Sequence, residues 1–188
     1  MLLGILFYIL LGFVLIFLFL GVIIYNRFMK LQQRCKEAWA DIDVQLQRRY
    51  NLIPNLLATV KGFTAHEKEV LEAVTEARAK AVSVSEVGDK SQAEGALSRS
   101  LKSLFAVAEN YPQLKSAPHF LELQKELTDT EDKVQAARRF YNNNVKDYNT
   151  RLAIFPDLLV AKQLRLQAMD LFEVENSVAR EVPKVSFN

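Results

Sequence analysis

The chain has 188 residues, a length typical of one domain with an appendage. Its 24 Lys and Arg residues are balanced by 22 Asp and Glu residues, which excludes a strongly basic nucleic-acid binder and an acidic tail protein. A single cysteine excludes an internal disulfide framework and a cysteine-rich zinc module.

Residues 1–26 form an apolar run that contains 22 apolar residues, three glycines, Asn26 and no charged residue. A run of this length and character predicts a membrane-spanning helix. A cleaved signal peptide is the alternative, but the run has no basic start, exceeds the usual apolar length and is followed by no A-x-A site. We therefore expect an uncleaved anchor in contact with membrane lipid.

Four basic residues follow the apolar run before the first acidic residue, Glu37: they are Arg27, Lys30, Arg34 and Lys36. Basic residues beside a membrane span favour the cytoplasmic side. The charge pattern therefore predicts that the C-terminal domain is cytoplasmic and that the N-terminus lies outside.

Apolar residues in the next segment recur at steps of three and four, which is typical of a helix with one buried face. The first stripe comprises Trp39, Ile42, Leu46, Tyr50, Ile53, Leu57 and Val60. Pro54 lies inside this stripe without changing its phase. Because proline removes a backbone hydrogen bond and crowds the preceding turn, we expect a kink there and not a helix end.

Further stripes predict three more helices. Thr64–Glu67 has the form of a capping box and predicts the start of the second helix. Gly88 and Asp89 predict a turn before a third helix over about residues 92–110. The stripe from Phe120 to Phe155 predicts the longest helix.

Together these patterns predict an all-α fold, because no segment shows sustained strand alternation between turn signals. We expect an N-terminal transmembrane helix over residues 1–26 and an antiparallel up-and-down four-helix bundle over residues 27–156. The remaining residues, 157–188, form a C-terminal amphipathic segment and tail.

The topology of such a bundle returns the chain to the membrane surface at residue 157. Apolar and basic side chains alternate there in a pattern typical of an interfacial element. The candidate membrane-surface contacts are Leu158, Leu159, Lys162, Leu164 and Arg165. The alternative is that these side chains pack back on the bundle or on a neighbouring subunit.

A search for catalytic, cofactor-binding and metal-binding motifs predicts none of the three. His66 and Glu67 begin a zinc-protease pattern, but Val70 stands where the second histidine is needed. No glycine-rich phosphate-binding motif occurs in the sequence. Cys35 lies in a charged stretch close to the predicted membrane, so we do not expect it to act as a nucleophile.

Polar residues on the predicted helices form a candidate partner surface, which comprises Asp41, Asp43, Arg48, Arg49, Asn142 and Asn149. The charged residues crowd one stretch of the first helix, and the alternative for them is ion pairs within or between helices. The two asparagines are seven residues apart and share a face. They could instead fix the register of packed helices.

Three blocks of the sequence resemble the LemA family: residues 38–79 (AWADIDVQ and onward), residues 111–156 (YPQLKSAPHF and onward) and residues 180–187 (REVPKVSF). With the anchor, the likeness covers about residues 22–187. It implies a bacterial single-pass inner-membrane protein with a cytoplasmic four-helix bundle, and it supplies no catalytic residues. Some family members occur beside a membrane zinc metalloprotease and others in magnetosome membranes, which implies a role in membrane protein quality control or membrane organisation.

The sequence therefore predicts a non-enzymatic, membrane-anchored scaffold or adaptor that presents its bundle to protein partners or to further copies of itself. Expected partners are membrane lipid through residues 1–26, a second copy of the chain, and a membrane protease or other membrane protein, but no nucleic acid. An accessory subunit or regulator of a membrane metalloprotease is the first alternative. A cryptic hydrolase is the second.

Overall fold

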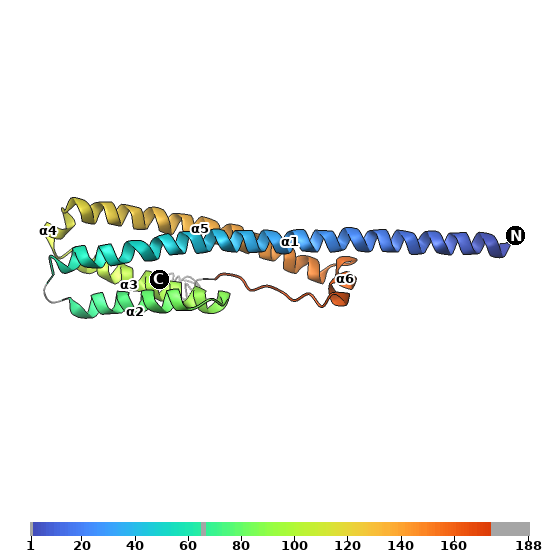
Figure 1. Ribbon diagram of the computed structural model, residues 1–188. Coiled ribbons are helices and arrows are strands. Elements are labelled where there is room, and N and C mark those ends of the chain that lie inside the picture. The colour runs from blue at the N-terminus through green and yellow to red at the C-terminus, as the bar shows by residue number, and fades with distance from the viewer. Residues whose placement is uncertain (1, 65–66, 174–188) are drawn as a thin grey trace, which may run out of the picture. The chain divides into compact units, whose positions relative to one another are not determined.

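The structure of the protein is a computed structural model that describes residues 2–64 and 67–173 (Figure 1). Regular structure within these ranges is helical throughout, with no strand, which confirms the predicted all-α class. The helices are α1 (Leu2–Lys61), α2 (Lys68–Ser83), α3 (Val87–Ala108), α4 (Pro112–Lys115), α5 (Pro118–Ala153) and α6 (Asp157–Gln163). His66 and the stretch 174–188, which includes the REVPKVSF block, lie outside the described residues.

Helix α1 joins the predicted anchor to the predicted first bundle helix without a break. Pro54 lies inside it, so the helix continues through the proline, as its unbroken stripe predicts. The helix ends at Lys61, directly before Gly62, whose amide still bonds to the Ala58 carbonyl oxygen over 3.3 Å. The basic residues after the apolar run therefore lie on the same helix as the run itself.

The start of α2 differs from the predicted capping box. The Thr64 hydroxyl donates a hydrogen bond to the Val60 carbonyl oxygen over 3.1 Å. No side-chain hydrogen bond caps α2 at Glu67, whose carboxylate instead accepts a hydrogen bond from the Tyr111 hydroxyl over 3.0 Å. The predicted capping box is wrong because both of its side chains have other partners.

The predicted turn at Gly88 and Asp89 is also wrong, since α3 already includes both residues. Lys90 explains the short connection between α2 and α3. Its ammonium group donates to the carbonyl oxygens of Ala81 and Val84, over 3.1 and 3.2 Å, at the C-terminal end of α2. A cation is favourable there because the last carbonyl groups of a helix lack intrahelical partners.

The described chain forms two compact units. Unit 1 comprises the residues up to Asp41 together with Ala137–Asp170, and unit 2 comprises Ile42–Ala136 together with the residues from Leu171 on. Both long helices, α1 and α5, contribute to each unit. Each unit is therefore built from segments that are distant in the sequence.

Unit 2 has an apolar core supplied by α1, α2, α3 and α5. Its buried side chains include Ile42, Leu46, Ile53, Leu56, Val60, Val74, Leu97, Leu104 and Leu127. Leu56 is fully buried whereas the predicted core residue Leu57 is half-buried. Val60 is buried as predicted, so after Pro54 the stripe differs from the prediction at this one position.

Aromatic side chains fill the core of unit 1 between α1 and α5. The ring centres of Phe28 and Tyr148 lie 6.0 Å apart in an edge-on arrangement, and those of Trp39 and Tyr141 lie 5.3 Å apart. Cys35 is buried in the same unit. Because such aromatic pairs contribute packing energy beyond their buried area, they hold the end of α5 against α1.

The segment that follows α6 bonds to α5 within unit 1. The Asn149 amide group donates to the Met169 carbonyl oxygen over 2.9 Å, and the Met169 backbone amide donates to the Asn149 side-chain oxygen over 3.0 Å. The Tyr141 hydroxyl donates to the Asp170 carbonyl oxygen over 3.0 Å. These bonds satisfy backbone groups that an extended segment cannot pair internally.

Candidate functional site

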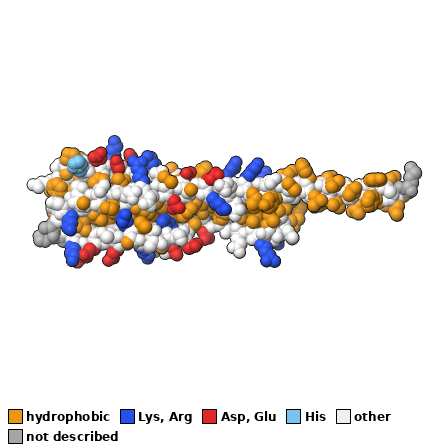
Figure 2. All heavy atoms as spheres, in the orientation of Figure 1, with side chains coloured by type: hydrophobic (Ala, Val, Ile, Leu, Met, Phe, Trp, Pro, Cys, Tyr) orange, Lys and Arg blue, Asp and Glu red, His pale blue; other side chains and the backbone are white. Residues whose placement is uncertain are grey.

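The N-terminal part of α1 presents its apolar side chains to its surroundings (Figure 2). Phe7, Phe17 and Phe19 are 62%, 69% and 68% exposed. Within the described part of the chain, α1 is the one helix long and apolar enough to cross a membrane. About 20 residues of this kind span the hydrocarbon layer. The helix therefore indicates membrane anchoring.

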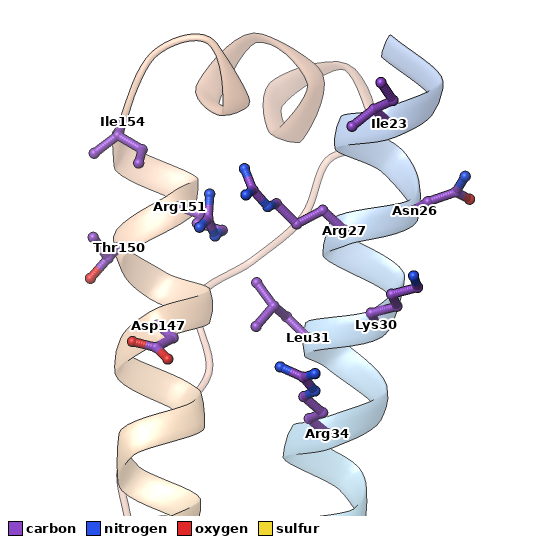
Figure 3. Close-up of a pocket in the computed structure, with 10 residues that line it drawn as sticks. All are labelled: Ile23, Asn26, Arg27, Lys30, Leu31, Arg34, Asp147, Thr150, Arg151 and Ile154. Carbon is purple, nitrogen blue, oxygen red and sulfur yellow. The ribbon is translucent and has the colours of Figure 1, made fainter. Parts of the chain in front are cut away.

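An open cavity of about 700 Å³ lies in unit 1 where this apolar segment ends (Figure 3). Arg27, Leu31 and Arg34 extend from α1 toward α5, and Arg151 extends from α5 toward α1 (Figure 3). The remaining lining residues are Ile23, Asn26, Lys30, Asp147, Thr150 and Ile154. The cavity thus combines basic side chains with apolar surface.

Helical periodicity explains how the basic side chains of α1 reach the cavity. Arg27, Lys30 and Arg34 are exposed and separated by three and four residues, a spacing that places side chains on neighbouring positions of one helix face. Phe28 and Leu31, interleaved with them, are buried. The apolar residues therefore fix the helix in unit 1 while the basic residues remain accessible.

Arg151 is held by a carboxylate from α6. Its guanidinium group donates to the Asp157 carboxylate over 2.9 Å, and Asp157 is buried. A carboxylate in the first turn of a helix is also favoured by the helix dipole. Asp147 is the acidic residue in the lining. The charges of the four basic side chains of the cavity are therefore only partly balanced by the carboxylates of Asp147 and Asp157, and positive charge is in excess.

Cys35, which lies close to this cavity in sequence, has the properties of a core residue. Burial and the nearby Asp147 carboxylate raise the pKa of its thiol. A thiol with a raised pKa stays protonated at neutral pH and is a poor nucleophile. Among the residues that the structure describes, no group of three or more His, Cys, Asp or Glu side chains could hold a metal ion.

Helix α6 carries three of the candidate membrane-surface residues, and Leu164 and Arg165 directly follow it. An open apolar groove of about 450 Å³ is lined by Phe17, Leu18, Gly21, Val22 and Tyr25 of α1 and by Leu159, Val160, Gln163 and Leu164 of the α6 region. Leu159 and Leu164 are 56% and 38% exposed, Lys162 and Arg165 are exposed, and Leu158 is half-buried. The groove places Leu159 and Leu164, two of the five candidates, beside the last turns of the apolar run.

The candidate partner surface is only partly at the surface. Asp41, Asp43 and Arg48 are exposed, and Asn142 is half-buried. Asn149 is half-buried and bonds to the backbone of Met169, so it has a structural role. Arg49 is 5% exposed. Its assignment to a partner surface is wrong, because its side chain is buried and forms an ion pair between helices.

Arg49 is the centre of a buried polar cluster in unit 2. Its guanidinium group lies 3.1 Å from the Glu94 carboxylate of α3 and 3.1 Å from the Glu131 carboxylate of α5. It also donates to the Ser98 hydroxyl over 2.8 Å. The Tyr50 hydroxyl donates a further hydrogen bond to Glu94. These contacts link α1 to α3 and α5 within unit 2.

Burial controls the protonation of this cluster. It raises the pKa of the Glu94 carboxyl, although the Tyr50 hydrogen bond and Arg49 oppose that change. Burial and the adjacent Glu94 carboxylate raise the pKa of Tyr50. Glu94 and Lys90 are functional residues of this cluster that the sequence did not predict. The spacing of Glu94 could have indicated its burial, because it lies three residues before the buried Leu97 and therefore on the apolar face of α3.

The model of the LemA family matches residues 38–187, which is most of the chain. The chain belongs to the LemA family. The matched region includes unit 2 as far as residue 187 and the end of α5, whereas the apolar part of α1 and the basic residues 27–34 precede it. The predicted family assignment is therefore confirmed, and the anchor and the α1 wall of the cavity are features of this chain outside the match.

Individual relatives are distant. The chain is 28% identical over 165 residues to Protein LemA of Metamycoplasma hominis, with 85% of this chain and 71% of the relative covered. It is 22% identical over 158 residues to magnetosome protein MamQ of Magnetospirillum gryphiswaldense and to MamQ 1 of Paramagnetospirillum magneticum. Those alignments cover 70% of this chain and 58% of each MamQ protein, so the chain spans less than two thirds of their length.

Proposed function

We propose that this LemA family member is a membrane-anchored helical scaffold or adaptor that acts through protein contacts and not through catalysis. The observation that carries the proposal is the continuity of α1, which extends from an exposed apolar segment into the packed cores of both units. A helix that is shared in this way ties the packed part of the protein to the bilayer. The magnetosome association named for the MamQ relatives is consistent with a role in membrane organisation.

The proposed arrangement of the packed part is an antiparallel four-helix bundle made by α1 after residue 26, α2, α3 and α5. Within unit 2, Arg49 of α1 contacts Glu94 of α3 and Glu131 of α5. The Tyr50 hydroxyl of α1 also lies 3.3 Å from the Ala81 carbonyl oxygen of α2. These contacts support a common core for the four helices.

The proposed location is a bacterial inner membrane, with the N-terminus outside and the packed part in the cytoplasm. The support is the group of basic residues that follows the apolar segment on α1, namely Arg27, Lys30 and Arg34. Such residues are retained on the cytoplasmic side during insertion. The cytoplasmic side is also where a soluble or membrane partner would meet the exposed residues Asp41, Asp43 and Arg48.

We propose self-association as the principal contact, because anchoring in one membrane raises the effective concentration of copies. The test is the mass of the full-length chain purified in mild detergent, measured by light scattering after size exclusion. We expect a homo-oligomer that is converted to monomers by Asp43→Lys with Arg48→Glu. A co-purifying membrane metalloprotease in fixed ratio would support the accessory-subunit alternative, and a monomer without partner would contradict the scaffold.

A matched control for that variant is Lys68→Glu with Glu72→Lys. These two side chains are exposed and form an ion pair over 3.5 Å, so exchanging them changes two surface charges but keeps the pair. We expect the control to leave the oligomer intact. Dissociation in both variants would show a general effect of charge and would not assign the contact to Asp43 and Arg48.

A further inference from the structure

We propose that the basic cavity of unit 1 binds the headgroup phosphate of an anionic phospholipid. The inference rests on membrane anchoring, which is one part of the proposed function, but it requires neither a scaffold role nor self-association. It concerns the cavity between α1 and α5 and the side chains that line it (Figure 3).

The charge of the cavity suits a group with net negative charge. Arg27 and Arg34 of α1 extend toward α5, and Arg151 extends from α5 toward α1 (Figure 3), with Lys30 also in the lining. Asp157 neutralises Arg151 through its ion pair, so the remaining positive charge of the lining comes from the side chains of α1. Arginine presents a planar fork of N–H donors that matches the oxygens of a phosphate.

Asp147 reduces the positive charge of the cavity but does not cancel it. It is exposed, lies one helical turn before Arg151 on α5 and is the acidic residue of the lining. With Arg151 paired to Asp157, the three cations of α1 and the Asp147 carboxylate leave an excess of two positive charges, which attracts a headgroup with a net negative charge. Phosphatidylglycerol carries that charge, whereas the choline group of phosphatidylcholine cancels it.

The position of the cavity favours a lipid over a free anion. It begins at Ile23, within the exposed apolar segment of α1, and its other apolar rim residue, Ile154, is 44% exposed. A headgroup bound between Arg27 and Arg34 would therefore have apolar side chains on its membrane side. Basic pockets beside a membrane helix on the cytoplasmic side are a recurrent form of lipid headgroup site.

The test uses the full-length chain in mild non-ionic detergent, to which phosphatidylglycerol or phosphatidylcholine is added, with bound lipid counted by native mass spectrometry. The detergent micelle has no sidedness, so an effect of the variants on membrane insertion cannot alter the result. We expect the protein to retain phosphatidylglycerol in preference to phosphatidylcholine. Equal retention of both lipids would overturn the proposal.

Two site variants should change retention in opposite directions. Arg27→Gln with Arg34→Gln should lower retention of phosphatidylglycerol by roughly tenfold or more, since each basic side chain near an anionic lipid contributes a factor of about five. Asp147→Asn should raise it. The matched control is Arg99→Gln with Arg139→Gln, which removes two exposed arginines of unit 2 and unit 1 outside the cavity and should leave retention unchanged.

The source of the phosphate is decided by competition with excess inorganic phosphate. Retained phosphatidylglycerol supports the lipid site, and complete displacement identifies a site for free phosphate and overturns it. A loss in the Arg99 and Arg139 control equal to that in the cavity variant would also overturn it. The same spectra report the oligomeric state. A monomer that retains phosphatidylglycerol would contradict the scaffold but support the lipid site. An oligomer that retains no phosphatidylglycerol would support the scaffold but contradict the lipid site.

Discussion

The Arg49 guanidinium group lies 3.1 Å from the Glu94 carboxylate, and both side chains are almost completely buried. The Glu131 carboxylate lies at the same distance from the same nitrogen atom of Arg49. A buried charge is tolerated only while it is paired, because its transfer from water is unfavourable. Unit 2 therefore depends on Arg49 to compensate the carboxylates of two other helices.

Replacing Arg49 with Met should destabilise the protein by about 3–5 kcal/mol, because Glu94 is then left buried without its cation. Adding Glu94→Gln to that variant should recover part of the loss, since the buried charge is removed as well. The measurement is urea unfolding of the full-length chain in detergent, followed by far-UV circular dichroism. The sign of the coupling between the two changes separates this explanation from a simple loss of packing.

The control for Arg49 is the exposed ion pair between Lys68 and Glu72, whose side chains are 82% and 60% exposed. Lys68→Met should change the free energy of unfolding by less than about 0.5 kcal/mol, as is usual for exposed pairs within one helix. If Arg49→Met were no more harmful than Lys68→Met, the buried cluster would have no role in stability.

The helices were predictable because apolar periodicity is a local property. The stripe around Pro54 predicted an unbroken helix, and the stripe from Phe120 to Phe155 predicted a helix close to the observed α5, Pro118–Ala153. The wrongly predicted positions have partners that are distant in the sequence. Glu67 does not cap α2, since it bonds to Tyr111, which lies 44 residues later.

Only the α1 residues of the candidate site could be identified from the sequence. Arg27, Lys30 and Arg34 stood out as a signal for membrane orientation, because they follow an uncharged run. Nothing in the local pattern joined them to Arg151, which the fold brings to the same cavity. Likewise, a charged residue such as Arg49 is expected at the surface, and the local pattern does not reveal that the buried Glu94 of α3 pairs with it.

Stability should fall with rising pH above about 10 because of Tyr141. Burial, with the neighbouring Cys35 and Asp170 side chains, raises the pKa of Tyr141 to about 12. The folded protein then keeps a proton that the unfolded chain releases between pH about 10 and about 12, so rising pH favours unfolding over that interval. The pKa of Tyr50 is raised too and acts in the same direction.

The measurement is the thermal unfolding temperature in detergent as a function of pH, for the natural chain and for Tyr141→Phe. The variant lacks one of the titrating groups, so its unfolding temperature should decline less steeply above pH about 10. It also lacks the hydrogen bond to the Asp170 carbonyl oxygen, which lowers its stability at every pH and leaves the slope as the informative quantity. Parallel declines in the two proteins would contradict the assigned pKa.

The orientation of the anchor is tested by reporters fused after Asn188. A fluorescent protein that folds in the cytoplasm should be active there, and alkaline phosphatase, which needs the periplasm, should be inactive. The physical reason is the retention of Arg27, Lys30 and Arg34 on the cytoplasmic side. The opposite pair of activities would reverse the topology and would place the basic cavity outside the cytoplasm.

The predicted contact of Leu158, Leu159 and Leu164 with the membrane surface can be tested on a fragment without the anchor, residues 27–188. Leu158→Ser, Leu159→Ser and Leu164→Ser together should weaken its binding to phospholipid vesicles at least tenfold, because each leucine loses roughly 1 kcal/mol of apolar burial at half exposure. Vesicle co-sedimentation measures the effect, and circular dichroism checks that the fragments keep equal helix content.

The matched control changes three exposed apolar residues of unit 2, Val44, Leu121 and Val82, to Ser. They are 63%, 49% and 48% exposed, similar to Leu159, so the control removes comparable apolar surface. We expect it to bind vesicles as the unaltered fragment does, since its three residues lie outside the groove that places Leu159 and Leu164 beside Phe17 and Tyr25 of the anchor. Equal binding by both variants would mean that the three leucines contact protein, as the following segment does, where the Met169 and Asp170 carbonyl oxygens accept hydrogen bonds from Asn149 and Tyr141 of α5.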